Sequence, residues 1–336
     1  MASIAKPQAN AGVETSWSER LGSFFSQEVV LFLCLIVLCV VVNAINGRFL
    51  AQRNVLDILT NSSIIAVAAI GMSMVIISGN IDISVGSLIG VLATISGTLA
   101  VNAETSGYPL WVSWVAPLIV GPLVGAFIGF LVAYLRIPAI VVSLGMMSIL
   151  QGGLIIATGG AWIYNLPEGY GIAQQKIAEI PVPIYFMVIL TIIAVLWMRY
   201  SATGRSIYAV GGNAEAARLS GISERRIIMT VFIINGLMVG IASVLFATKF
   251  NAIQSTVPPG IELQIITAAV VGGVSILGGV GTVIGSTLAA IFIQAIGSAM
   301  QFTRISDYWI QAVQGVLILI TVLVDLFRRR QMMRGG

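Results

Sequence analysis

Histidine is absent from this chain, and charged residues are few. Of its 336 residues, 9% are charged and 58% are hydrophobic. A soluble domain usually carries about a quarter charged residues, so this composition indicates a membrane protein. Without histidine, the chain lacks the commonest general base and the commonest zinc ligand, which argues against hydrolytic or metal chemistry. We therefore predict no catalytic residue and no metal site.

Cysteines and targeting signals are also scarce. Cys34 and Cys39 fall in one hydrophobic stretch, where we expect small apolar side chains rather than a disulfide or a metal site. Residues 1–28 are polar, and we expect no cleavable signal peptide there. Ser16 and Glu19 have the spacing of a capping box. An amphipathic helix in the cytoplasmic interface is predicted for this segment, with an extension of the first span as the alternative.

Long stretches without Asp, Glu, Lys or Arg dominate the rest of the chain. A transmembrane helix needs roughly 20 such residues. The stretch 263–303 has 41 residues, about twice that length, and its glycines at 278–281 suit a turn. The fold class predicted is therefore all-α and polytopic, with ten spans at 29–46, 57–78, 83–102, 111–135, 138–157, 183–199, 227–248, 262–279, 282–301 and 308–326.

The basic residues predict the orientation. If the N-terminus is cytoplasmic, 12 of the 17 basic residues lie inside and five lie outside, as the positive-inside rule requires. Both termini are then cytoplasmic. The chain divides into the N-terminal segment 1–28, a permease domain 29–327 and a basic tail 328–336, with a cytoplasmic loop at 199–226. Basic residues at helix ends suit anionic lipid headgroups, so no nucleic-acid partner is expected.

Ionisable groups are almost missing from the predicted spans. An ion-driven transporter normally keeps such a group in the membrane, and the only candidate is Asp82. Asp82 can cap the third span, with Ser84 and Ser87 following it. Alternatively, Asn80 and Asp82 offer hydrogen bonds to solute hydroxyls in a broken helix. A similar pattern at 79–87 and 278–286 suggests an internal duplication, for which chance is the alternative in so glycine-rich a chain.

The loop 199–226 is where a nucleotide-driven partner could act on the chain. Asn213 can cap a short helix from Ala214 to Leu219, with Glu215 in the first turn and Gly221 past its end. A rigid helix of small residues is what a nucleotide-driven partner could grip. An ordinary basic loop is the alternative that spacing alone favours.

Four segments resemble a known family and favour the first interpretation. They are 204–222 (GRSIYAVGGNAEAARLSGI), 80–87 (NIDISVGS), 137–145 (IPAIVVSLG) and 268–279 (AAVVGGVSILGG). All four resemble bacterial sugar permeases of the ribose, xylose and arabinose ABC-import group, at family-like spacing from about residue 50 to 326. Gly79-Asn80 departs slightly from the family pattern. The external segment 158–167 (TGGAWIYNLP) is more similar to autoinducer-2 and rhamnose permeases.

The resemblance implies a function and a set of partners. Members are inner-membrane permease subunits that pair with a second copy or a paralogue, bind a cytoplasmic ABC ATPase and receive a monosaccharide-like solute from a periplasmic binding protein. The chain has no Gly-x-x-x-x-Gly-Lys-Ser/Thr motif, so we expect ATP and Mg²⁺ on the ATPase and no cofactor here. An ion-coupled transporter is the alternative function, and a membrane enzyme is disfavoured.

The resemblance assigns residues of the cytoplasmic loop to contact with the ATPase, namely Gly204, Arg205, Gly211, Gly212, Asn213, Glu215, Ala216, Ala217, Arg218 and Gly221. Two segments, 78–87 and 272–286, are expected to be broken helices, and backbone freed from helical hydrogen bonds is tolerated only where protein or water satisfies it. The translocation path is therefore expected there, at Asn80, Asp82, Ser84, Gly86, Gly272, Gly273 and Ser275. We expect Asn80, Ser84 and Ser275 to face the axis between two permease chains.

Overall fold

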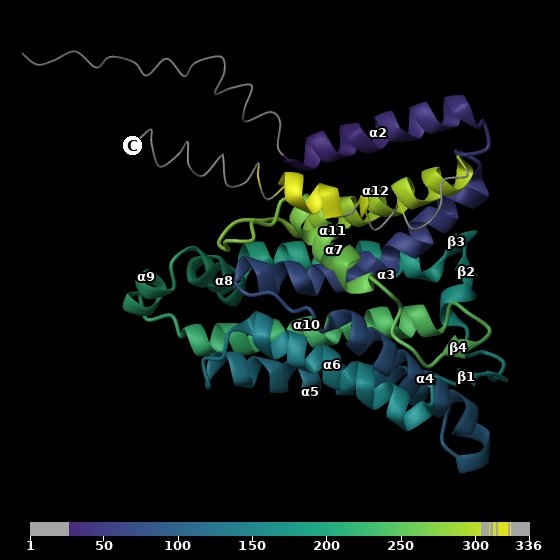
Figure 1. Ribbon diagram of the computed structural model, residues 1–336, viewed down its shortest axis with the longest axis horizontal. Coiled ribbons are helices and arrows are strands. Elements are labelled where there is room, and N and C mark those ends of the chain that lie inside the picture. The colour runs from purple at the N-terminus through teal and green to yellow at the C-terminus, as the bar shows by residue number, and fades with distance from the viewer. Residues whose placement is uncertain (1–26, 304–308, 310–311, 314, 322, 324–336) are drawn as a thin grey trace, which may run out of the picture.

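The computed structural model describes residues 27–303 and, beyond them, residues 309, 312–313, 315–321 and 323. The predicted interfacial helix at 16–28 and the tail 328–336 therefore lie largely or wholly outside the described residues. The described chain is a bundle of roughly parallel and antiparallel helices with small strands at one end (Figure 1). The predicted all-helical architecture is confirmed for its bulk.

Eight helices among the described residues are long and apolar enough to cross a membrane. They are α2 (Gln27–Ile45), α3 (Gln52–Ile77), α4 (Val85–Ser106), α5 (Val112–Ala133), α6 (Ala139–Thr158), α7 (Val182–Tyr200), α10 (Glu224–Ala247) and α12 (Val283–Phe302). Each overlaps a predicted span. The last predicted span, 308–326, lies partly outside the described residues, and those of its residues that are described are helical.

The eighth predicted span is wrong as a continuous helix. Helix α11 (Ile261–Val271) has 11 residues and ends before Gly272. At 1.5 Å per residue it is about 16 Å long, roughly half the thickness of the hydrocarbon core. Gly273, Gly278 and Gly279 then adopt positive φ values of 98°, 83° and 76°. Glycine tolerates these left-handed conformations and disfavours helix, so the chain turns here instead of continuing to 279.

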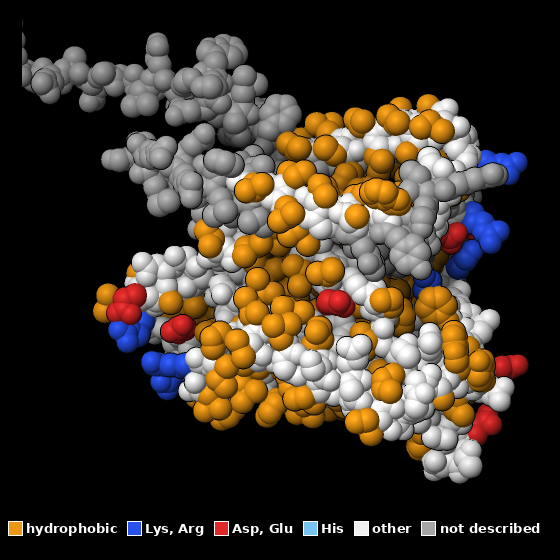
Figure 2. All heavy atoms as spheres, viewed as in Figure 1, with side chains coloured by type: hydrophobic (Ala, Val, Ile, Leu, Met, Phe, Trp, Pro, Cys, Tyr) orange, Lys and Arg blue, Asp and Glu red, His pale blue; other side chains and the backbone are white. Residues whose placement is uncertain are grey.

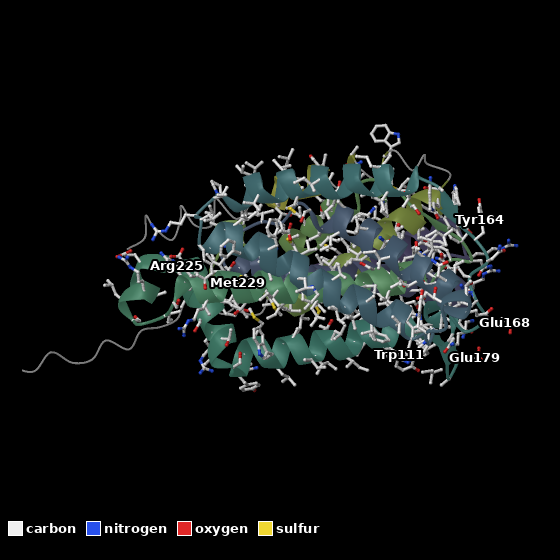
Figure 3. All side chains as sticks on the ribbon, turned by 90° about the horizontal axis from the view of Figure 1, so that it is seen from below. Trp111, Tyr164, Glu168, Glu179, Arg225 and Met229 are labelled. Atoms are coloured by element: carbon white, nitrogen blue, oxygen red, sulfur yellow. The ribbon has the colours of Figure 1, made fainter. Side chains whose placement is uncertain are left out.

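Charged and apolar side chains separate along the bundle. Figure 2 shows most Lys, Arg, Asp and Glu side chains near the two ends, one acidic side chain near the middle, and many hydrophobic side chains between the ends. In Figure 3, Arg225 and Met229 lie toward one end, whereas Trp111, Tyr164, Glu168 and Glu179 lie toward the other. An apolar band between polar ends is the pattern of a multi-pass membrane protein, with aromatic residues at an interface.

Small strands occupy the end that carries Tyr164. Strand β1 (Trp162–Ile163) pairs with β4 (Ile253–Gln254), and β2 (Lys176–Ile177) pairs with β3 (Ile180–Pro181), both antiparallel; the short 3-10 helix η1 (Ile172–Gln174) lies between β1 and β2. The sequence did not predict these strands. The β1–β4 pair ties the connection after α6 to the one after α10, which fixes that end of the bundle.

Helix α3 lies at the centre, with every residue from Ser62 to Ile77 buried. Helices α5 and α10 cross in close contact, because glycines on both helices remove side chains from the crossing. A methyl group on Gly236 would lie 2.2 Å from the Gly121 carbonyl oxygen, and one on Gly125 would lie 2.2 Å from that of Phe232. Small residues that allow close backbone approach are typical of packing between membrane helices.

Candidate functional site

Two short helices form the segment that the sequence assigned to coupling. Helix α8 (Ala202–Gly212) was not predicted, and α9 (Ala214–Leu219) has the predicted bounds. The Ser201 hydroxyl oxygen accepts from Gly204 N at 2.8 Å, and Asn213 Oδ1 accepts from Ala216 N at 2.9 Å, so each side chain caps a helix. Gly221 has φ +82°, a left-handed conformation that ends α9 as expected.

Helix α9 protrudes from one end of the bundle (Figure 1). Glu215 Oε1 and Arg218 Nη2 form an ion pair at 2.5 Å, with both side chains about two-thirds exposed (66% and 65%). Leu219 is 80% exposed, whereas Ala217 is buried against the bundle. An exposed surface ion pair contributes little to stability, about 0–1 kcal/mol, so these side chains are available to a partner.

The remaining predicted coupling residues have structural roles. Gly204 is buried where α7 turns into α8, and a methyl group there would lie 2.4 Å from the Met198 carbonyl oxygen. Arg205 is exposed and donates to the Tyr200 carbonyl oxygen at 2.9 Å. Ala216 lies on the exposed side of α9. No observation tests their contact with an ATPase, which stays a prediction.

Helix α8 rests on both broken segments at a junction of glycines. A methyl group on Gly211 would lie 1.7 Å from the Ile77 carbonyl oxygen and 2.7 Å from Gly279 N. The Gly279 N–H donates to that same Ile77 oxygen at 2.8 Å. A methyl group on Gly278 would lie 3.0 Å from Gly79 Cα. The end of α3, the second break and α8 therefore meet backbone to backbone.

A side-chain contact extends this junction. Tyr208, on α8, donates its hydroxyl to the Gly281 carbonyl oxygen at 3.0 Å, just before α12 begins. Tyr208 is half-buried, and this burial raises the pKa of its hydroxyl, which keeps the proton available for the hydrogen bond. Helix α8 therefore contacts both the end of α3 and the residues just before α12. The two similar sequence patterns, at 79–87 and 278–286, lie side by side here.

Asp82 holds the first break, the irregular residues 78–84 between α3 and α4, through hydrogen bonds. This carboxylate is 1% exposed. Its Oδ1 accepts from Ser84 N at 3.0 Å and from the Ser84 hydroxyl at 2.6 Å, and its Oδ2 accepts from Asn235 Nδ2 at 2.9 Å. Ser84 is the N-cap of α4, and no side chain caps this helix, so Asp82 holds the residue before the helix instead of accepting from its first N–H groups as predicted. Asn235, which ties the break to α10, was not predicted from the sequence.

The second break, 272–282, folds back on itself. Ser275 N donates to the Val280 carbonyl oxygen at 3.0 Å, and Gly278 N donates to the Ser275 carbonyl oxygen at 2.9 Å. Gly272 packs directly on the backbone of α12, where a methyl group would lie 2.4 Å from Ser286 N. The Ser286 and Ser73 hydroxyls bond at 2.7 Å, which links α12 to α3.

Most residues predicted for the translocation path are enclosed by their own chain. Asp82, Ser84, Gly86, Gly272 and Ser275 are buried, and Asn80 and Gly273 are half-buried. Their role in the path, and the predicted exposure of Asn80, Ser84 and Ser275 to an axis between two chains, stay predictions.

The sequence reasoning missed Glu262, at the start of α11. Its carboxylate lies against Gly86, where a methyl group would be 2.4 Å from Glu262 Oε2. This residue falls just outside a charge-free stretch, so hydropathy placed it at a membrane surface. The half-length helix instead begins inside the bundle, beside the start of α4.

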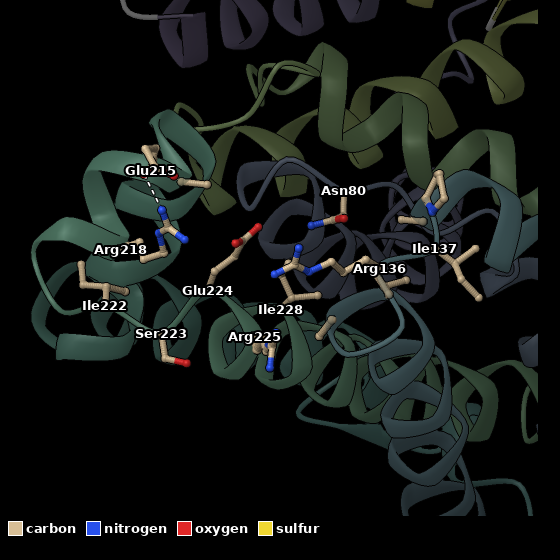
Figure 4. A pocket seen from close by; sticks show the side chains of 15 residues that line it. Asn80, Arg136, Ile137, Glu215, Arg218, Ile222, Ser223, Glu224, Arg225 and Ile228 are labelled. Carbon is tan, nitrogen blue, oxygen red and sulfur yellow. Dashed lines mark hydrogen bonds and ion pairs between the residues drawn. The ribbon is translucent and has the colours of Figure 1, made fainter.

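A cavity of 720 Å³ connects α9 with the first break. Its lining includes Asn80, three arginines and two glutamates, and Figure 4 shows Asn80, Arg136, Glu224 and the Glu215–Arg218 pair around it. The charged lining residues are Arg136, Arg218, Arg225, Glu215 and Glu224. Arg136 has a φ of 58°, in the left-handed region, at the tight turn between α5 and α6. This charged opening faces the same end as α9.

Among the residues that the structure describes, no group of three or more His, Cys, Asp or Glu side chains could hold a metal ion. Backbone contacts join α8 to the end of α3 and to the second break.

Comparison with known proteins gives one family and a set of curated relatives. Residues 54–322 match the family described as "Branched-chain amino acid transport system / permease component". The autoinducer 2 import system permease protein LsrC of Enterobacter sp. (strain 638) is 35% identical over 301 residues, which cover 89% of this chain and 87% of that protein. The protein of the same name from Escherichia coli (strain K12 / DH10B) is 35% identical over 306 residues, with the same coverage. No solved structure gives a significant match.

Proposed function

Because this chain belongs to the family of branched-chain amino acid transport system permeases, it is a transport permease, and we propose that it imports a small hydroxylated solute at the expense of ATP. The observation that carries this proposal is the 35% identity, over 89% of the chain, to an autoinducer 2 import permease. The solute class is therefore a monosaccharide, such as ribose or rhamnose, or autoinducer 2. The chain forms the membrane passage and does not catalyse a reaction.

The partners follow from the role of a permease in an importer. A separate cytoplasmic ABC ATPase binds ATP and Mg²⁺, since the sequence has no phosphate-binding loop motif. The ATPase binds α9, and the exposed Leu219 and Glu215–Arg218 pair of this helix support the assignment. A periplasmic binding protein delivers solute at the opposite end of the bundle. A second copy or a paralogue completes the passage in the bacterial inner membrane.

The proposed topology has ten crossings, with both termini in the cytoplasm. The positions of α8 and α9 at the end that carries Arg136 and Arg225 support it, because basic residues favour the cytoplasmic side. Helix α11 and the irregular residues 255–260, between β4 and the start of α11, together form one broken crossing. Broken helices that line a protein-enclosed region are a recurrent feature of transporters.

The glycine junction supplies the proposed mechanism. Closure of the ATPase on α9 displaces α8, and the contacts of Gly211 and Tyr208 carry that displacement to both breaks. The ends of α3 and α12 then shift relative to α10, which opens or closes the passage. No ion gradient enters this scheme, because Asp82 is enclosed and used by Ser84 and Asn235.

Uptake measurements in proteoliposomes test the proposal. The chain is reconstituted with its ATPase and binding protein, and uptake of labelled autoinducer 2, rhamnose and ribose is followed with ATP inside. We expect uptake of at least one of these solutes, abolished when the catalytic glutamate of the ATPase is replaced by glutamine. Uptake that survives this replacement but collapses with a sodium or proton ionophore would instead identify an ion-coupled transporter.

A further inference from the structure

A second polar cavity lies inside the membrane bundle, at the end away from α9. It has a volume of 380 Å³ and lies between α3, α11 and α12, with Lys249 from the connection after α10. Its polar lining residues are Asn54, Asp57, Thr60, Asn61, Lys249, Gln264, Gln294, Ser298 and Gln301. The residues from α3 belong to its first ten, and those from α12 to its last nine, whereas the opposite end of α3 and the residues just before α12 contact α8.

Amide side chains dominate this lining. Gln294 Nε2 donates to Gln264 Oε1 at 3.1 Å, and Ser298 Oγ donates to Asn54 Oδ1 at 2.9 Å. Lys249 Nζ donates to Asn61 Oδ1. Among the described residues, Gln264 Nε2 and Gln294 Oε1 make no hydrogen bond, so this pair keeps a free amino group and a free carbonyl oxygen.

A polar cluster of this kind is expensive in a membrane unless something satisfies it. Polar side chains in membrane helices are rare, face the bundle interior or a water-filled cavity, and mark solute pathways. Nothing in the packing of the bundle requires five amides on three elements, since apolar residues would fill the same space. The cluster is therefore suited to a polar occupant.

The lining also selects the charge of its occupant. Lys249 and Asp57 interact electrostatically, so one cation and one anion offset each other in the cavity. A neutral molecule is then preferred over an ion. Each amide offers a donor and an acceptor side by side, which matches neighbouring hydroxyl groups, each able to donate and accept. The volume lies within the range of about 300–1,000 Å³ that small-molecule sites usually have.

We propose that this cavity is a binding site for a neutral polyhydroxylated solute within the permease chain itself, held between α3, α11 and α12. The inference rests on the proposed function, because it names where the imported solute is held. The site lies at the end where the binding protein would release its solute. A shift of α12, which Tyr208 contacts at its other end through Gly281, would alter the cavity.

A cysteine placed in the cavity gives a direct test. Ser298→Cys, and separately Thr60→Cys, are made in a chain whose Cys34 and Cys39 are replaced by alanine. The complex with its ATPase, in membranes, is treated with a small hydrophilic thiol reagent, with and without saturating rhamnose, ribose or autoinducer 2. We expect both thiols to react, and at least one of these solutes to slow the reaction at least threefold.

Amide variants show whether the lining recognises the solute. Gln264→Met and Gln294→Met keep the side-chain length but remove the amide, and Gln52→Met is the control, because Gln52 is exposed at the start of α3 and outside the cavity. Protection of the Ser298→Cys thiol should be lost in the first two variants and kept in the control. Co-purification with the ATPase checks that each variant is assembled.

Several results would overturn the site. They are thiols at both positions that do not react, reaction rates that no solute changes, and protection that survives loss of both amides. The outcome for the function is separate. If the wild-type complex imports none of the three solutes, the proposed function fails, while protection of the thiol by a hydroxylated solute still supports the cavity as a site.

Discussion

Replacing Gly211 by alanine should uncouple the permease, because this glycine is where α8 touches both breaks. The added methyl group would lie 1.7 Å from the Ile77 carbonyl oxygen, and ordinary contact begins at 3.4 Å. The backbones of α8 and of the end of α3 must therefore move apart by the difference between these two distances. Such a shift also breaks the 2.8 Å hydrogen bond from Gly279 N to Ile77 O.

The magnitude follows from these contacts. Overpacking typically costs about 1–3 kcal/mol, and the lost hydrogen bond adds roughly 0.5–1.5 kcal/mol. A gain of up to about 1 kcal/mol in helix propensity offsets part of this. A net loss of about 1–3 kcal/mol at the junction corresponds to roughly a 5-fold to 150-fold change in the balance between two conformations.

Gly212 provides a matched control one residue away. A methyl group there would have its nearest neighbour, Gly279 Cα, at 3.9 Å, an ordinary contact. Gly212→Ala therefore has the same composition and a similar gain in propensity without the clash. We expect Gly211→Ala to reduce uptake in proteoliposomes about fivefold or more while the ATPase still co-purifies, and Gly212→Ala to leave uptake within about twofold of wild type. Equal uptake in the two variants would refute the junction as the route of coupling.

Three further predictions concern packing and topology. Gly236→Leu should destabilise the purified chain by about 1–3 kcal/mol and so lower its melting temperature, because the α5 backbone occupies the space that the side chain would need. Gly145→Leu should leave the melting temperature unchanged, because no atom lies within 4 Å of the added Cβ. Asn235→Ala should destabilise the chain by about 1–3 kcal/mol in the same assay, since a buried carboxylate loses its donor; an unchanged melting temperature would contradict this. In a chain without native cysteines, a cysteine at Gln174 should react with an impermeant reagent outside spheroplasts and one at Ser223 should not; the reverse pattern would invert the topology.

The helical architecture was largely predictable, because hydropathy reports burial in lipid directly. Each long charge-free stretch between residues 27 and 262 contains one long helix, and the Asn213 cap located α9 correctly. Capping depends on a few neighbouring residues, so local sequence is sufficient for it. Helix α8 was missed because its sequence, with Gly204, Gly211 and Gly212, has low helix propensity and forms a helix only through packing on the bundle.

The contacts of the site were not predictable to the same degree. The partnership of Asp82 with Asn235 joins residues 153 positions apart, and no spacing rule reports such a pair. The close approach of Gly211 to Ile77 was equally unpredictable, because two consecutive glycines in the sequence do not show which backbone segment packs against them. The polar cavity was missed for another reason. Its amides are spread over three elements, and each is unremarkable in its own helix.

The half-length helix α11 shows why hydropathy alone misplaces function in this fold. Residues 262–279 are as apolar as a continuous span, yet glycines at 272, 273, 278 and 279 let the chain stop after 11 helical residues. The backbone groups freed there are satisfied by Ile77, Ser275 and Val280, within the protein rather than by lipid. An irregular segment held by a few backbone hydrogen bonds can be rearranged at lower cost than a full helix. Hydropathy predicts that the segment 272–282 belongs to ordinary membrane spans, yet this segment is the part of the bundle that α8 is best placed to move.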